Sequence, residues 1–453
     1  MESENAINTL LLPERTRLFY IGPMKTGTTS LQQAAHAARA TMYRHGVYYP
    51  GKGRNHRLAI NAFLKRPDTM VAGRTIIPGQ SVADVRFVPS ENTWNSLIED
   101  IESEPEKRIM ISHEFASNAS EEEAKRFVDE LGPSCTHIAI TLRPLSDMLR
   151  SHWIERIKSG ERKRFDEWLT TMLDPEATTI STNLKRQTDQ AALVERWANA
   201  VGPENVTVIV ASSDDKNLST SAFEEMLGLP ERTLTGSIQD GRLSNRSLSQ
   251  SEAELIRQLN VAVNRPDELS WHVYREVIQR GSVFQMLEHP SSTKSDPKVR
   301  IPAWAADTIV ELAIRHVRRI EATGVRIVGN LESLCYKPIV AAEDVEDSDT
   351  IQLDIAVNAL IGSVNGAMNY ENKLSKQISK LHRRIDRSNE KRRNSKHKAE
   401  NAKRNSLRSA LDQFPAEKQP DKAARALSTR QLMRALKIRL VYKLRYRRSM
   451  PLK

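Results

Sequence analysis

The sequence of 453 residues has little cysteine and no long apolar run. Its two cysteines, Cys135 and Cys335, are too few and too far apart in sequence for a disulfide framework or a thiolate metal site, which indicates a reducing compartment. No segment reaches the uninterrupted apolar length of about 18 residues that a membrane span requires. The N-terminus carries acidic residues where a signal peptide needs basic ones, so we expect a cytoplasmic protein.

Positive charge is concentrated at the C-terminus. Residues 371–453 contain 26 Lys+Arg and 7 Asp+Glu, a net charge of +19. Because the whole chain has a net charge of +11, residues 1–370 carry −8. The tail, and not the body, is therefore the part that we expect to meet phosphates or anionic lipids.

Short apolar segments alternate with helical segments through the first half of the chain. Strands are predicted at residues 17–22, 108–112, 136–142 and 205–211. Before the third strand, Ser120 is a predicted N-cap ahead of three glutamates, and Gly132 ends that helix. This alternation predicts an α/β fold, a P-loop-type parallel sheet flanked by helices, with the ligand at the carboxyl ends of the strands.

The pattern becomes mainly helical after Ser247. Pro302 suits the first turn of one of these helices, and residues 325–334 predict a last short strand and turn. We expect residues 1–340 to form the main domain, 341–370 a linker with a short helix, and 371–453 a basic tail that is helical or partly disordered.

Two stretches of the tail have apolar periodicity. Leu374, Ile378, Leu381 and Ile385 keep heptad-like spacing for about two heptads, which is too short for a coiled coil, so a solvated basic helix or a disordered linker is predicted there. Further on, four leucines share one face among basic residues: Leu432, Leu436, Leu440 and Leu444. A basic amphipathic helix of this kind predicts either peripheral contact with the inner face of a membrane or docking in the groove of a partner.

The segment GPMKTGTT, Gly22–Thr29, lies between a predicted strand and a predicted helix, where backbone amides bind anions. Its two glycines have the Walker A separation, but Thr28 occupies the lysine position and the only lysine, Lys25, lies three residues earlier. A P-loop kinase or NTPase, the alternative that the loop leaves open, also needs a carboxylate for Mg²⁺ after a nearby strand, and no convincing one is present.

This loop resembles the 5′-phosphosulfate loop of sulfotransferases that use 3′-phosphoadenosine-5′-phosphosulfate (PAPS). The family motif is P-K-x-G-T-T, and here Met24 is inserted between Pro23 and Lys25. The resemblance implies that Lys25 contacts the oxygen that bridges sulfate and phosphate. It also implies that the rest of the loop wraps the 5′-phosphate, through Thr26, Gly27, Thr28, Thr29 and Ser30.

A second element strengthens the resemblance. Arg143 follows the predicted strand 136–142, and Ser151 lies eight positions later on the next helix. In the family an arginine and a serine at this separation bind the 3′-phosphate, and a guanidinium forks well onto phosphate oxygens. The resemblance covers about residues 15–335 and is nearest to bacterial carbohydrate or glycolipid sulfotransferases. It also suggests that Arg242 and Asn245 border the cofactor, although a loop that caps the following helix explains them as well.

The family implies in-line transfer of a sulfuryl group from PAPS to a hydroxyl or amine, with no metal. The sequence contains no H-E-x-x-H motif and no Cys/His cluster. Related enzymes use a His or Glu as general base, and the candidates here are Glu114, after the strand 108–112, His56, after the first helix, and then His113.

The acceptor favoured by the resemblance and by the basic tail is a glycan or a lipid-linked saccharide. A different class of protein, a non-catalytic nucleotide-binding protein with a tail that binds nucleic acid or a membrane, is the other alternative. The tail has few aromatic residues apart from Tyr442 and Tyr446, so no specific nucleic acid is expected as a partner.

Overall fold

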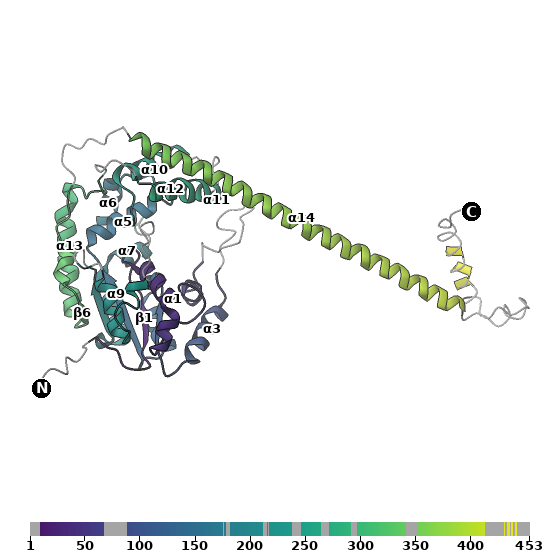
Figure 1. The fold of residues 1–453 in the computed structure, drawn as a ribbon, viewed down its shortest axis with the longest axis horizontal. Helices are drawn as coiled ribbons and strands as arrows, with labels where there is room; N and C mark the ends of the chain where they lie inside the picture. Colours follow the sequence, from purple (N-terminus) through teal and green to yellow (C-terminus); the bar gives the residue numbers. More distant parts are fainter. Residues whose placement is uncertain are drawn as a thin grey trace, which may run out of the picture. The chain divides into compact units, whose positions relative to one another are not determined.

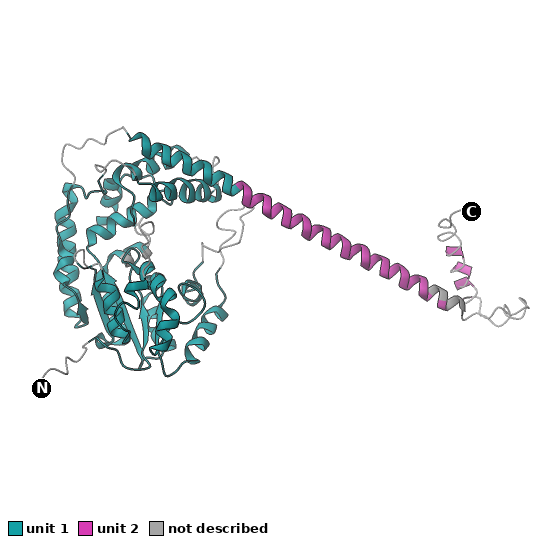
Figure 2. Ribbon diagram, viewed as in Figure 1, with its two compact units in different colours: residues 1–370 teal, residues 371–453 magenta. Residues whose placement is uncertain are grey.

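The computed structural model describes residues 10–67, 88–174, 176–177, 182–211, 215, 217–237, 246–263, 271–290, 297–340, 351–412, 430, 433–434, 436–437 and 440–441. The chain divides into two units, Met1–Tyr370 and Glu371–Lys453 (Figure 2). Arg242, Asn245, Leu432 and Leu444 lie outside the described residues, so the predictions made for them stay predictions.

A six-stranded parallel sheet forms the centre of the first unit (Figure 1). Its spatial order is β2-β3-β1-β4-β5-β6, which places β1 between β3 and β4. The strands are β1 Arg17–Tyr20, β2 Val47–Tyr48, β3 Arg108–Ser112, β4 Thr136–Leu142, β5 Val206–Val210 and β6 Arg326–Val328.

Helices cover both faces of this sheet. Along β1, Leu18 lies on the face covered by α1 (Thr28–Arg44) and α9 (Leu218–Leu227), and Phe19 lies on the opposite face. That opposite face is covered by α2 Arg57–Phe63, α3 Glu91–Glu102, α4 Glu121–Leu131, α8 Gln190–Val201 and the C-terminal half of α13, Ala303–Ala322. All residues of β4 are buried because both of its faces are covered.

A second, mainly helical core lies beyond the sheet. Figure 1 shows several of its helices grouped together. Its members are α5 Leu145–Ile157, α6 Phe165–Leu173, α7 Thr182–Thr188, α10 Gln250–Val263, α11 Trp271–Tyr274, a π-helical segment Arg275–Ser282, α12 Val283–Glu288, the N-terminal half of α13 and the start of α14, Leu353–Asp412. No helix among the described residues combines the length and the apolar content needed to cross a bilayer.

The predicted fold class is confirmed: a parallel sheet flanked by helices, followed by a helical basic C-terminal region. The four predicted strands form, and so does the last short strand, β6. The capping predictions hold, because the Ser120 side chain accepts a hydrogen bond from the backbone N–H of Glu123 and Gly132 ends α4. Strand β2 was missed, since two residues give no detectable periodicity.

Candidate functional site

The carboxyl ends of three neighbouring strands converge on the loop that follows β1. In the parallel register Tyr20 of β1 pairs with Ser112 of β3 and with Ala139 of β4. Because parallel strands end at the same edge, the loop after β1, Glu114 after β3 and Arg143 after β4 emerge side by side. This edge of the sheet therefore gathers most of the site residues predicted from the sequence.

The loop between β1 and α1 is a tight turn. Thr26 Oγ1 donates a hydrogen bond to the carbonyl oxygen of Pro23 at 2.7 Å, which closes the loop on itself. Gly27, the residue before α1, has a φ of 94°, in the left-handed region that favours glycine. Lys25 also has a positive φ, 71°, although it is not a glycine. The turn thereby places a lysine just ahead of a helix N-terminus.

The first turn of α1 is suited to an anion. Its N-cap, Gly27, has no side chain, so no side-chain hydrogen bond caps the helix. The next two residues are Thr28, which is buried, and Thr29, which is exposed. Ser30, half-buried, donates its backbone N–H to the carbonyl oxygen of Gly27 at 3.1 Å. The backbone N–H groups at the start of a helix and the positive end of its dipole favour a phosphate group here.

The ammonium group of Lys25 is paired with a carboxylate that the sequence analysis did not identify. Lys25 Nζ lies 2.6 Å from Glu155 Oε1, and Lys158 Nζ lies 2.8 Å from the same oxygen. Burial alone would raise the pKa of Glu155, but the nearby charges of Lys158 and Lys25 outweigh burial and lower this pKa to about 2. Glu155 is therefore ionised at neutral pH.

Arg143 contacts the same loop directly. Its Nη1 donates a hydrogen bond to the carbonyl oxygen of Lys25 at 2.7 Å, and its Nη2 donates to Asp147 Oδ2 at 3.2 Å. Gln190 Nε2 donates to the Arg143 carbonyl oxygen at 2.7 Å and so fixes the backbone at this point. The guanidinium group is thus anchored beside the loop that carries the lysine.

Ser151 lies between these two ion pairs on α5. Asp147, Ser151 and Glu155 are spaced four residues apart, so they share one face of the helix. Since Asp147 contacts Arg143 and Glu155 contacts Lys25, this face is turned toward the loop. A rise of 1.5 Å per residue puts the backbone of Ser151 about 6 Å along the axis from the backbone of Asp147 and of Glu155. Lys25, Arg143 and Ser151 are therefore brought together.

Glu114 lies on the other side of the loop, at the start of a 3-10 turn, Glu114–Asn118. Gln32 of α1 donates a hydrogen bond from Nε2 to Glu114 Oε2 at 3.3 Å and to Ser112 Oγ at 3.1 Å. Asn55 Nδ2 in turn donates to Gln32 Oε1 at 3.1 Å. This chain of amides fixes the Glu114 carboxylate, whose side chain keeps 19% of its surface exposed.

The two histidine candidates for a general base are buried. His56 Nδ1 accepts the backbone N–H of Ser112 at 3.1 Å, so Nε2, 3.1 Å from the Pro50 carbonyl oxygen, carries the proton. Burial lowers the pKa of His56 to about 4. His113 Nδ1 accepts the backbone N–H of Phe115 at 3.1 Å, and its Nε2 lies 3.7 Å from Glu114 Oε2. Backbone groups thus occupy both nitrogens of His56.

Four residues near this site were not predicted from the sequence: Asp147, Gln32, His152 and Glu155. The two acids could have been found from the spacing of four residues around Ser151. His152 is buried, and its Nε2 has no hydrogen-bond partner among the described residues. Burial and then the charge of Lys25 lower its pKa to about 4. Nothing in the sequence distinguishes this histidine from one in the core.

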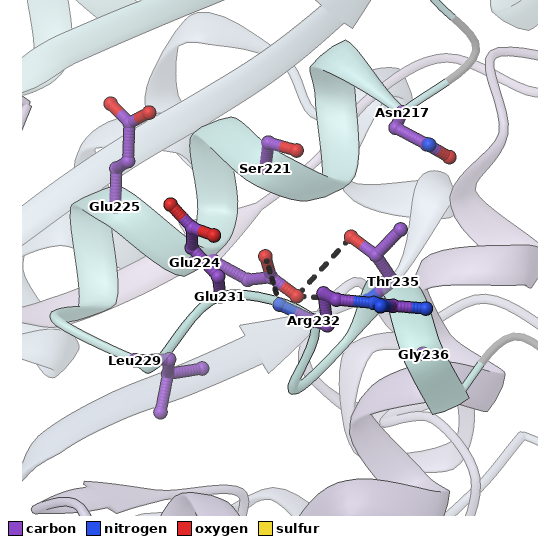
Figure 3. Close-up of a pocket in the computed structure, with 9 residues that line it drawn as sticks. All are labelled: Asn217, Ser221, Glu224, Glu225, Leu229, Glu231, Arg232, Thr235 and Gly236. Atoms are coloured by element: carbon purple, nitrogen blue, oxygen red, sulfur yellow. Dashed lines mark hydrogen bonds between the residues drawn. The ribbon is translucent and has the colours of Figure 1, made fainter.

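A separate pocket lies beside α9 (Figure 3). Glu224 and Glu225 of α9, Glu231 and Arg232 contribute to its lining. Glu224 already accepts backbone N–H groups from Arg232, Leu234 and Thr235, so it supports the local turn. Three carboxylates disfavour an anionic ligand. This pocket is therefore not a candidate phosphate site.

No protein family model matches this chain, and no curated protein matches it. Among solved structures, a sulfotransferase from Alicyclobacillus acidocaldarius is similar to it, with 17% sequence identity and a TM-score of 0.35. The similarity covers 69% of this chain and 96% of the other.

Proposed function

We propose that this chain is a PAPS-dependent sulfotransferase that acts on a hydroxyl or amine of a glycan or a lipid-linked saccharide. The observation that carries the proposal is the meeting of Lys25, Arg143 and Ser151 at the end of β1. These residues come from two segments far apart in the sequence, and each supports binding of a phosphate or a sulfate group. A lysine on the apex of the loop suits PAPS better than it suits ATP held by a Walker A lysine.

The reaction needs a stabilised leaving oxygen. The acceptor oxygen or nitrogen attacks sulfur, the bond from sulfur to the bridging oxygen breaks, and the electron pair stays on the 5′-phosphate. Negative charge therefore builds on that oxygen, where Lys25 and the first amides of α1 are suited to stabilise it. Glu155 is paired with the ammonium group of Lys25, so binding of the nucleotide exchanges this carboxylate for the bridging oxygen.

The proton of the acceptor needs a base, and Glu114 fits this role best. Its carboxylate is oriented by Gln32 and partly exposed at the edge where the loop lies. His56 has both ring nitrogens engaged with backbone groups and is buried, so it has no free nitrogen to offer. Glu114 therefore takes the acceptor proton as sulfur transfers.

Incubation of the purified chain with ³⁵S-labelled PAPS and separated host fractions tests this function. Glycans, lipid-linked saccharides and a protein fraction form the arms, and γ-labelled ATP with the same fractions tests the kinase alternative. We expect label from PAPS in a saccharide fraction and none from ATP. Transfer from ATP, or no transfer from PAPS to any fraction while PAPS binds, would contradict the proposal.

A further inference from the structure

Helix α14 presents apolar side chains on two opposite sides within the first unit. Ile355 and Ala359 are buried in the helical core. On the same side Gly362 packs so closely that a Cβ atom there would lie 2.5 Å from the carbonyl oxygen of Gly281. With 3.6 residues per turn, Val357, Leu360 and Val364 lie on the other side, and they are 43%, 65% and 58% exposed. One side of α14 therefore packs on the helical core, and a second apolar side stays exposed.

The exposed residues continue a heptad repeat found in the sequence of the tail. From position 357 the steps of three and four residues reach 360, 364, 367, 371, 374, 378, 381 and 385, about four heptads. One helix, Leu353–Asp412, carries all of these positions. In the second unit Ile378, Leu381 and Ile385 are 52%, 53% and 54% exposed. The repeat is thus longer than the two heptads recognised in the tail alone.

The residue types at these positions specify the kind of partner. At the a positions β-branched residues dominate: Val357, Val364, Ile378 and Ile385. At the d positions leucine dominates: Leu360, Leu374 and Leu381. β-Branched residues at a with leucine at d favour two parallel strands over three or four. The exceptions are Ala367 at d and Glu371 at a, and a polar a residue fixes the register at some loss of stability.

We propose that a second copy of this chain covers these positions, so that two α14 helices form a parallel coiled coil over residues 357–385. Burying seven apolar side chains from each helix removes on the order of 1,000 Å² of surface, the range that a specific interface needs. The repeat ends where Ser388 and Arg392 take the next d and a positions. Two basic helices would repel each other beyond this point.

Sedimentation equilibrium of the full chain tests the proposal. We expect a mass twice the 51.3 kDa of one chain. A variant with Ile378→Asp and Leu381→Asp should be monomeric, because it buries charges in the seam, the line of a and d positions between the two helices. The matched control, Asn372→Asp with Ser379→Asp, adds the same charge at b positions on the outer face and should stay dimeric. A monomeric unmodified chain, a trimer or tetramer, or a dimer that survives the seam variant overturns the proposal.

Cross-linking in the otherwise unchanged chain gives a measurement that does not depend on a disruptive variant. In a parallel pair Leu381→Cys faces its own copy at a d position, whereas Arg383→Cys points outward at f. Mild oxidation should therefore join the copies only through position 381. If neither cysteine joins two copies, or if the chain is monomeric and binds vesicles of anionic phospholipid through this helix, the seam has a different occupant and the inference is wrong.

Discussion

Arg143 Nη1 donates a hydrogen bond to the carbonyl oxygen of Lys25 at 2.7 Å, across 118 residues of sequence. The contact joins the end of β4 to the loop after β1, so the two cationic side chains share one edge of the sheet. Asp147 and Glu155, from one face of α5, balance their charges. An anionic ligand must therefore compete with two carboxylates for these cations.

Replacing Lys25 with alanine should abolish most of the sulfuryl transfer but leave nucleotide binding. Removal of one group that stabilises a developing negative charge costs about 10²- to 10³-fold in kcat. Arg143, Ser151 and the amides of α1 stay in place, so the affinity for adenosine 3′,5′-bisphosphate should change much less. Steady-state kinetics and calorimetry measure the two quantities separately.

The control for this variant is Lys107→Ala. It removes a lysine just before β3, at the amino ends of the strands, whereas the candidate site lies at their carboxyl ends. It should turn over at the rate of the unmodified chain. Near-normal turnover of Lys25→Ala would show that Lys25 does not stabilise the leaving oxygen.

Glu114→Gln should lower kcat by about 10²- to 10⁴-fold with little change in PAPS affinity, because a general base acts on the acceptor proton. His56→Asn should instead lower the stability of the fold, since it removes a buried ring that hydrogen-bonds the backbone at Ser112 and Pro50. Kinetics and thermal unfolding of both variants distinguish these roles. If His56→Asn folds normally and loses turnover while Glu114→Gln does not, the base has been assigned to the wrong residue.

Glu155→Gln should increase the affinity for adenosine 3′,5′-bisphosphate by about three- to tenfold at low ionic strength. The half-buried carboxylate competes with the nucleotide for Lys25, and a pair of this kind is worth about 1 kcal/mol. Glu106→Gln, which breaks an exposed pair with Arg15, serves as the control and should leave the affinity unchanged. Weaker binding in Glu155→Gln would mean that the carboxylate orients Lys25 and does not compete with the ligand.

The sequence predicts the sheet and most of the candidate site because both depend on local signals. The loop at residues 22–29 and the pair Arg143 and Ser151 have fixed spacings, and strand order then brings them together. Gln32 was missed because its role depends on which side of α1 meets Glu114 and Ser112. Only packing decides that side. The length of α14 was missed for a related reason, since its first turns pack on the body through glycines.

Stability should fall as the pH drops from about 6.5 to 4. Burial lowers the pKa of His137 to about 4, with a smaller contribution from the charge of Arg326, and the unfolded chain binds the same proton near pH 6.5. The unfolded state thus binds more protons in this window. The contribution of His137 to the free energy of unfolding is therefore fully present above pH 6.5 and decreases as the pH falls below it. A histidine whose pKa is lowered in this way adds about 1.2 kcal/mol per pH unit to the slope of the unfolding free energy near pH 5.

His137→Asn should therefore reduce the slope of the unfolding free energy between pH 6 and 5 by about one proton, measured by urea denaturation. Glu155 contributes much less to this slope, because its pKa of about 2 keeps it ionised in the folded protein and the unfolded chain binds only roughly a quarter of a proton there at pH 5. His397→Asn, on an exposed part of α14, is the control. An unchanged slope in His137→Asn would show that His137 binds protons equally in the folded protein and in the unfolded chain, which contradicts a lowered pKa.

The most direct test of the account is calorimetric titration of the purified chain with adenosine 3′,5′-bisphosphate, with AMP and with ATP. We predict binding of the bisphosphate to one site, at least tenfold weaker binding of AMP, which lacks the 3′-phosphate, and loss of this difference in Arg143→Ala. Arg44→Ala, at the far end of α1, should keep the difference. Equal binding of AMP and the bisphosphate by the unmodified chain, or preference for ATP, would contradict the claim that Lys25, Arg143 and Ser151 form one site for PAPS.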